Sequence, residues 1–232
     1  MENYVLEAHE NAPLIVSFAF NHNGADPTPY MDWRLNHIEQ MTGKKLSKLY
    51  LQDMRSFWYQ CGADGTGQNA NETASFIRNI ASQLKASSIT TLGESMGGYA
   101  ALSIGILAEV DSIIAFAPIS FFNQQQALQF ADLRYIWKML ESNCLYPTAT
   151  ADIGTLANYR KFNGKATVAY GMQPELKHVD STTFDAVHAW RIKSYFPSVN
   201  LEGFPQSGHL VAAHLKDIGL LDKFLIDRIP SL

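Results

Sequence analysis

Two continuous apolar runs of strand length constrain the fold of this chain most strongly. Residues 14–20 read LIVSFAF and residues 112–117 read SIIAFA, almost without polar side chains. Such runs are typical of central strands in a parallel sheet, because helices cover those strands on both faces. A turn sequence, NHNG at 21–24, ends the first run, and Pro118 ends the second. The sequence therefore predicts a sheet that is buried on two sides.

Strand-length and helix-length segments alternate along most of the chain. Strands are expected over 14–20, 46–51, 89–92, 112–117, 167–170 and 199–203, and helices over 30–41, 69–84 and 96–107. Two further helices are expected, one that follows the strand over 167–170 and extends up to 196, and a last one that begins at about 210. This order favours an α/β fold, a mostly parallel sheet with helices on both faces. Residues 121–160 contain helical runs without a clear strand, and they are a candidate cap insertion. Since the chain has 232 residues, we expect one domain over 1–232.

Composition and charge exclude several classes of function. The net charge is −4 and no Lys/Arg-rich run occurs, which argues against nucleic acid as a partner. Two cysteines, Cys61 and Cys144, form no metal-ligand pattern and no disulfide framework. The first 14 residues contain no lysine or arginine, so they do not resemble a secretory signal, and no apolar stretch is long enough to span a membrane. We expect a cytoplasmic protein without a metal or cofactor, and the oligomeric state stays open.

A Gly-x-Ser-x-Gly motif is the most informative short pattern. Gly93, Ser95 and Gly97 follow an expected strand over 89–92 and begin an expected helix. In a nucleophile elbow the serine lies on a sharp strand-to-helix turn, and the residues two before and two after must be small to avoid collision. The backbone N–H of Met96 would then stabilise an oxyanion at the positive end of the helix. The alternative is an ordinary tight turn whose hydroxyl only caps the helix.

A serine hydroxyl needs a neighbouring base to act as a nucleophile. In chains with this elbow the order is serine, acid, histidine, so the base should lie late. His209 lies in the polar segment QSGHL at 206–210, just before the expected last helix, whereas His214 lies within that helix. We therefore predict His209 as the general base. Its alternative role is that of a residue beside a helix N-cap.

The acid should follow the expected strand over 167–170. Asp180 is the preferred candidate, and Asp185 and Glu175 are the alternatives. Asp180 could instead be an N-cap, and Asp185 could complete a capping box with Thr182.

A second oxyanion donor is expected in the loop after the first strand. The backbone N–H of Asn21 or of His22 fits by position. The same NHNG sequence is also an ordinary turn.

The elbow resembles that of α/β-hydrolases, and more narrowly that of a bacterial group with SMGGYAAL elbows often associated with surface-polysaccharide genes. The similar segments read SFWYQCG at 56–62, GESMGGYAAL at 93–102, IAFAP at 114–118 and GHLVAAHLKDIGL at 208–220. The resemblance implies the α/β-hydrolase fold and a Ser–acid–His triad at Ser95 and His209. It implies no substrate. The loop after Gly171 is longer than the group's usual pattern, and this leaves the acid open.

These residues predict a serine hydrolase that cleaves a small-molecule carboxylic ester or thioester. The same groups would transfer the acyl chain to an alcohol or a sugar hydroxyl if the pocket excluded water. A non-catalytic binding or assembly module on this fold is a further alternative. A nucleotide-binding Rossmann domain is not favoured, because no G-x-G-x-x-G follows the first strand.

Overall fold

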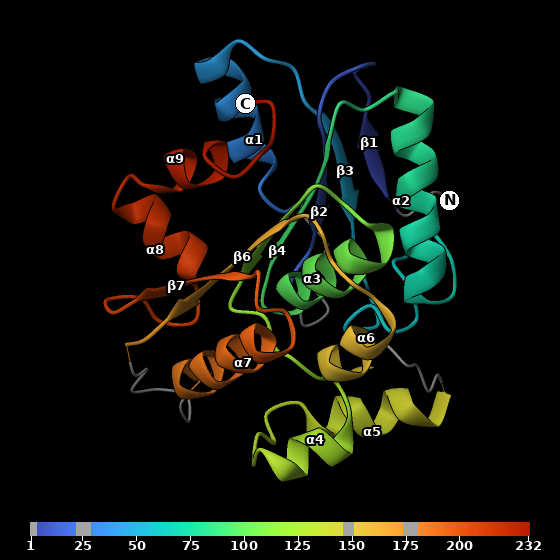
Figure 1. Cartoon of the computed structure of the whole chain (residues 1–232), viewed down its shortest axis with the longest axis vertical. Helices are drawn as coiled ribbons and strands as arrows, with labels where there is room; N and C mark the ends of the chain where they lie inside the picture. Colours follow the sequence, from blue (N-terminus) through green and yellow to red (C-terminus); the bar gives the residue numbers. More distant parts are fainter. Residues whose placement is uncertain (1–3, 22–28, 146–150, 174–180) are drawn as a thin grey trace.

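The computed structural model describes residues 4–21, 29–145, 151–173 and 181–232, and a seven-stranded sheet runs through them in the order β1-β3-β2-β4-β5-β6-β7 (Figure 1). Only β1 is antiparallel to its neighbour, and the remaining pairs are parallel. The strands are β1 (Val5–Glu7), β2 (Leu14–Phe18), β3 (Ser47–Leu51), β4 (Ile89–Glu94), β5 (Ser112–Phe116), β6 (Lys165–Gly171) and β7 (Asn200–Phe204).

Helices cover both faces of this sheet. One face carries α1 (Asp32–Thr42), α8 (Val211–Asp217) and α9 (Leu221–Ile226), and the other carries α2 (Ala70–Leu84), α3 (Met96–Ala108) and α7 (Ser181–Tyr195). Successive side chains of a strand point to opposite faces. In β2, Ile15 therefore packs with the first group of helices, and Val16 and Phe18 pack with the second. Because helices exclude water from both faces of the sheet, β2 is apolar at nearly every position. The prediction of a mostly parallel α/β sheet is confirmed.

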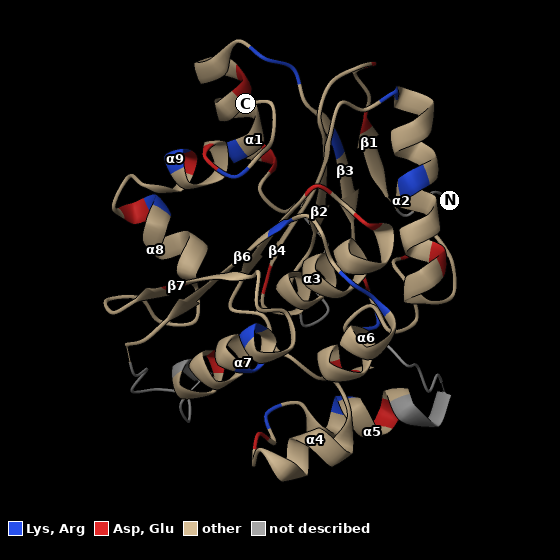
Figure 2. Cartoon of the chain, viewed as in Figure 1, with Lys and Arg blue, Asp and Glu red and all other residues tan. Residues whose placement is uncertain are grey.

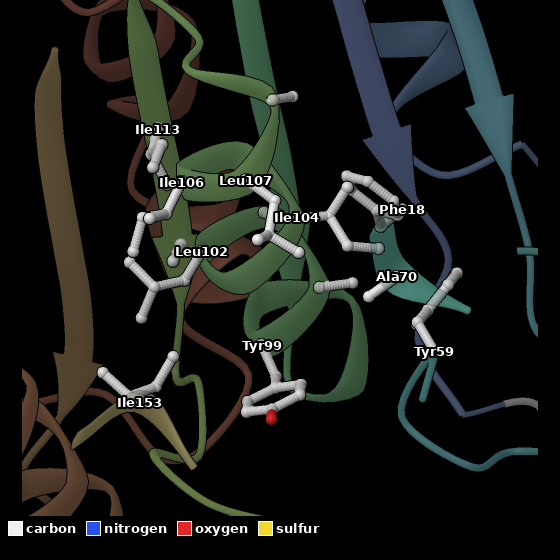
Figure 3. Close-up of a cluster of buried hydrophobic side chains, with 14 of the residues drawn as sticks. Phe18, Tyr59, Ala70, Tyr99, Leu102, Ile104, Ile106, Leu107, Ile113 and Ile153 are labelled. Carbon is white, nitrogen blue, oxygen red and sulfur yellow. The ribbon is translucent and has the colours of Figure 1, made fainter. Parts of the chain in front are cut away.

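Helix α3 lies against the centre of the sheet, and all of its side chains are buried. Figure 3 shows Leu102, Ile106 and Leu107 of this helix between Phe18 of β2 and Ile113 of β5. A helix that is apolar all round belongs in a core rather than at a surface. The buried helix fixes the position of its own N-terminus, where Ser95 lies.

The connection from β5 to β6 (residues 117–164, the β5–β6 connection) contains α4 (Gln124–Gln129), α5 (Ile136–Leu145) and α6 (Ile153–Tyr159). Figure 1 shows α4 and α5 at one end of the molecule, apart from the helices that flank the sheet. Within the connection, an isolated bridge joins Phe121, which precedes α4, to Asp152, which precedes α6. The expected cap segment, 121–160, falls within this connection.

The structure differs from the expected elements at two places. Strand β1 was not predicted, because three residues at a sheet edge give too short a pattern to detect. The expected last helix is two helices, α8 and α9. Gly219, at φ 73°, ends the first of them, because glycine adopts the left-handed conformation of a helix C-terminus without steric cost.

Charged side chains of both signs occur on the same helices. Figure 2 shows Lys or Arg together with Asp or Glu on α2, α8 and α9. Within the described parts of the chain, no helix is both long enough and apolar enough to cross a membrane.

The close contact at Gly97 gives a first prediction. A Cβ atom added at Gly97 would lie 2.3 Å from the carbonyl oxygen of Phe18 and 2.9 Å from that of Ala19, which are rigid backbone atoms. We expect Gly97→Ala to lower the free energy of unfolding by about 3 kcal/mol or more, the upper range for overpacking. Urea denaturation measures this change.

Gly43→Ala is the matched control. Gly43, unlike Gly97, has a positive φ, 68°, and no atom lies within 4 Å of an added Cβ, so only backbone strain of about 1–2 kcal/mol is expected. Equal losses in the two variants would contradict a steric role for Gly97.

Candidate active site

Ser95 lies at the sharp turn between β4 and α3. Its backbone has φ 55° and ψ −116°, a conformation that few non-glycine residues adopt and that costs on the order of 1–3 kcal/mol. Its N–H donates to the carbonyl of Phe116 at 2.9 Å, which holds the turn on the neighbouring strand. A Cβ at Gly93 would lie 2.3 Å from the backbone of Gly97, so both flanking positions need glycine. The strain is maintained by packing on every side.

A hydrogen-bonded relay leads from Ser95 to a buried carboxylate. The Oγ of Ser95 lies 3.0 Å from Nε2 of His209, and Nδ1 of His209 lies 2.6 Å from Oδ2 of Asp185. Asp185 belongs to α7 and is fully buried, whereas His209 lies in the loop before α8. If Nδ1–H donates to the carboxylate, Nε2 is free to accept the serine proton.

The other predicted site residues are placed as follows. Asp180, Glu175 and His22 lie outside the described residues. Met96 is the first residue of α3, so its N–H has no acceptor within the helix. Asn21 lies beyond the end of β2, and β2 pairs with β4 so that Phe18 is opposite Gly93. The side-chain oxygen of Asn21 accepts a hydrogen bond from Ser56 Oγ at 3.0 Å.

Burial and charge act in opposite directions on His209. Burial alone would lower the pKa of the imidazole, but the hydrogen bond and the charge of Asp185 outweigh it. The pKa of His209 is therefore raised from its ordinary value of 6.5, although the positive charge of Arg134 opposes the rise.

Glu94 is a component of the site that the sequence did not single out. Its carboxylate is buried at the end of β4, accepts the N–H of Ala212 at 3.0 Å and lies 3.4 Å from the hydroxyl of Tyr30. Burial raises the pKa of Glu94. Because Ala212 is in the first turn of α8, this contact joins the elbow to the helix that follows His209. A carboxylate at a helix N-terminus is stabilised by the unpaired N–H groups there.

A second Ser–His–Asp set lies beside the first. The N–H of Ser120 donates to Nδ1 of His188 at 3.0 Å, its Oγ lies 2.9 Å from the same nitrogen, and Nε2 of His188 lies 2.9 Å from Oδ2 of Asp132. All three side chains are buried, at 0%, 1% and 3% exposure. The ring nitrogen beside the hydroxyl already accepts a backbone N–H, and Ser120 itself has no exposed surface among the described residues. This set is structural.

The segment SFWYQCG also contacts the β5–β6 connection. Ser56, Trp58 and Tyr59 all have positive φ values, and the carboxylate of Asp53 accepts the N–H of Tyr59 at 2.8 Å. The ring of Trp58 stacks 4.6 Å from Phe122, and the ring of Tyr135 lies 4.5 Å away. Trp58 therefore packs against the part of the β5–β6 connection that contains Phe122 and Tyr135, and Tyr135 interacts with Ser95.

The chain was compared with known proteins by sequence and by structure. No protein-family model matches the chain, and no curated protein matches its sequence. Solved structures do match. They include a hyperthermophilic esterase from the archaeon Pyrobaculum calidifontis, with TM-score 0.61 and 12% identity over 95% of this chain and 77% of the esterase.

Two other solved structures agree. An S-formylglutathione hydrolase from Agrobacterium tumefaciens has TM-score 0.61 and 14% identity, over 97% of this chain and 89% of the hydrolase. MPT51 (FbpC1) from Mycobacterium tuberculosis has TM-score 0.63 and 14% identity, over 97% of this chain and 92% of its own. The chain has the α/β-hydrolase fold. Ser95 follows β4, the central strand of the seven-stranded sheet.

The two histidines give a second prediction, with opposite signs. Burial lowers the pKa of His188 below 6.5, so its contribution to stability is lost as the pH falls through 6.5. The pKa of His209 is raised, so its contribution is present below 6.5 and lost as the pH rises through the folded-state value. Relative to the wild type, we expect the stability deficit of His188→Gln to shrink between about pH 8 and about pH 5.5, and that of His209→Gln to grow.

Urea unfolding at the two pH values measures both deficits, and each variant is the control for the other. Deficits that change in the same direction would contradict the opposite environments of the two rings.

Proposed function

We propose that the chain is a serine hydrolase that cleaves a carboxylic ester or thioester, with Ser95 as nucleophile, His209 as general base and Asp185 as the acid of the triad. The single observation that carries the proposal is the relay from the strained Ser95 through His209 to a fully buried carboxylate. A strained elbow that aims a hydroxyl at an imidazole has a cost, and such strain is concentrated at functional sites.

The proposed reaction follows from this arrangement. Ser95 Oγ attacks the acyl carbon while its proton passes to Nε2 of His209, and Asp185 stabilises the imidazolium. His209 then donates that proton to the leaving alcohol or thiol, which leaves an acyl group on Ser95. Water, deprotonated by His209, attacks this ester, and His209 returns the proton to Ser95 Oγ as the acid is released. The N–H of Met96 is the proposed first oxyanion donor, and that of Asn21 the second, with His22 as its alternative.

The assignment of Asp185 departs from the expectation that Asp180 is the acid. Asp185 lies in the part of α7 where its carboxylate contacts His209 Nδ1 directly, at 2.6 Å. One carboxylate at Nδ1 is enough to fix the tautomer. We therefore propose Asp185 as the acid of the triad, and Asp180 is the alternative to be tested by mutation.

The solved structures with this fold support ester chemistry, because their descriptions name esterases and an S-formylglutathione hydrolase. We also propose that the β5–β6 connection is a cap over the site. Tyr135, which comes from this connection, interacts with Ser95 through its hydroxyl. With Trp58 and Phe122 it forms an aromatic cluster near the nucleophile, which favours an apolar acyl group.

Acyl transfer is the second candidate. The resemblance of the elbow to the bacterial SMGGYAAL group, with its surface-polysaccharide association, makes a sugar hydroxyl the acceptor to test. Adding a sugar or a simple alcohol to the ester assay would divert the acyl group into a new ester if transfer competes with hydrolysis. Free acid as the sole product would favour hydrolysis.

The nucleophile gives a third prediction. Ser95→Ala should lower turnover of p-nitrophenyl esters by on the order of a million-fold and should abolish labelling by a fluorophosphonate probe. A panel of esters with increasing chain length also gives the preferred acyl group. Ser103→Ala is the matched control, because it removes a nearby hydroxyl, buried within α3, that donates to the carbonyl of Tyr99 at 2.8 Å. More than about a tenth of wild-type activity in Ser95→Ala would refute the assignment.

The acid gives a fourth prediction. Asp185→Asn should keep the shape of the side chain but lower turnover by about four orders of magnitude, because an amide cannot hold the required tautomer or stabilise the imidazolium. Asp180→Asn and Glu175→Gln should remain near wild type. Turnover of the three variants on one ester decides among the carboxylates, and a collapse of Asp180→Asn alone would restore the original expectation.

A further inference from the structure

A buried guanidinium lies between the triad and the second Ser–His–Asp set. The Nε and Nη2 atoms of Arg134 each lie 2.8 Å from an oxygen of Asp132, a two-point contact. Its Nη1 lies 3.4 Å from Oδ1 of Asp185. One cation of the β5–β6 connection therefore contacts two buried carboxylates, one structural and one in the proposed triad.

The guanidinium is held from its far side. Asp132 accepts from His188, and His188 accepts from Ser120, directly after β5. These contacts attach the fork of Arg134 to α7 and to the central sheet rather than to a loose surface loop. The burial of these groups makes their geometry rigid, because an unpaired charge there would be costly.

Asp185 uses both of its oxygens. Oδ2 meets Nδ1 of His209 at 2.6 Å, and Oδ1 faces Arg134 at 3.4 Å. Arg134 is only 15% exposed, and its guanidinium lies over the ring of Phe184, 5.0 Å from the centroid. Charge effects are strong where water is excluded.

We propose that Arg134 is a positioning residue of the triad, which orients the Asp185 carboxylate toward His209 and places a positive charge beside the pair. This inference rests on the proposed function. It assigns to the β5–β6 connection an electrostatic role in addition to covering the site.

The charged groups around His209 come from three elements. Asp185 on α7 and Glu94 on β4 favour the protonated imidazole, and Arg134 opposes it. Without the guanidinium, both carboxylates would act without opposition, and the imidazole would hold its proton to higher pH. A protonated His209 cannot accept the serine proton, so the acid limb of kcat/KM reports this balance.

The test compares the pH profile of kcat/KM among variants at position 134. In Arg134→Gln and Arg134→Met, which remove the charge, we expect the acid limb to move up by about one pH unit, a tenfold loss of kcat/KM below the limb. In Arg134→Lys, which keeps the charge but not the fork, the limb should stay near its wild-type position while kcat falls. Gln can still donate to a carboxylate, so it preserves the fold if the Met variant does not fold.

Arg191→Met is the matched control. Arg191 is also buried, but it pairs with Asp152 at 2.7 Å and donates to the carbonyl of Ser120, in the second Ser–His–Asp set. Its loss should lower stability and leave the acid limb in place. An unmoved limb in Arg134→Gln, or an equal movement in Arg191→Met, would overturn the role of Arg134. Activity that survives Ser95→Ala would instead refute the proposed function itself.

Discussion

The arrangement of the site depends on the close approach of α3 to the ends of β2 and β4. The backbone of Gly97 meets the carbonyl of Phe18, and that of Gly93 meets Gly97, at distances that no Cβ atom permits. This contact forces the chain to turn at Ser95 within one residue and holds its φ at 55°. The buried α3 cannot move to relieve the turn, because its side chains fill the space between the sheet and its neighbours. The position of one hydroxyl is thus an outcome of packing over the whole central layer.

Polar groups complete what apolar packing begins. Glu94 connects the elbow strand to α8, and Asp185 connects α7 to His209, so one buried carboxylate holds the helix that follows His209 and another holds Nδ1 of its imidazole. Buried carboxylates are tolerated only where hydrogen bonds or cations compensate for the loss of water. Here an N–H group of α8 donates a hydrogen bond to Glu94, and the guanidinium of Arg134 forms an ion pair with Asp185. Stability and orientation come from the same contacts.

The sequence was informative where the physics is local. The apolar run at 14–20 predicted a central strand, and Gly93-x-Ser95-x-Gly97 predicted a sharp turn, because both depend on neighbouring residues. Long-range partners were not predictable in this way. Asp185 was one of three candidate acids in the sequence, behind Asp180, and its contact with His209 exists only because the fold brings α7 beside a loop 24 positions later. Glu94 and Arg134 gave no pattern either, since a lone charged residue next to an elbow or in a helical run is common. In the structure Asp185 and His188, which are three positions apart, pair one face of α7 with buried polar partners.

That pairing links the two networks mechanically. Asp185 and His188 lie on one face of α7, less than one turn apart, and they join His209 and Asp132 respectively. Fraying of this part of α7 would separate both pairs in a single event. The fraction of molecules in which the site is assembled is therefore bounded by the local opening equilibrium of one helical turn, a quantity that amide hydrogen exchange reports. In this molecule the population of the assembled site and the protection of a few helical amides are two views of the same free energy.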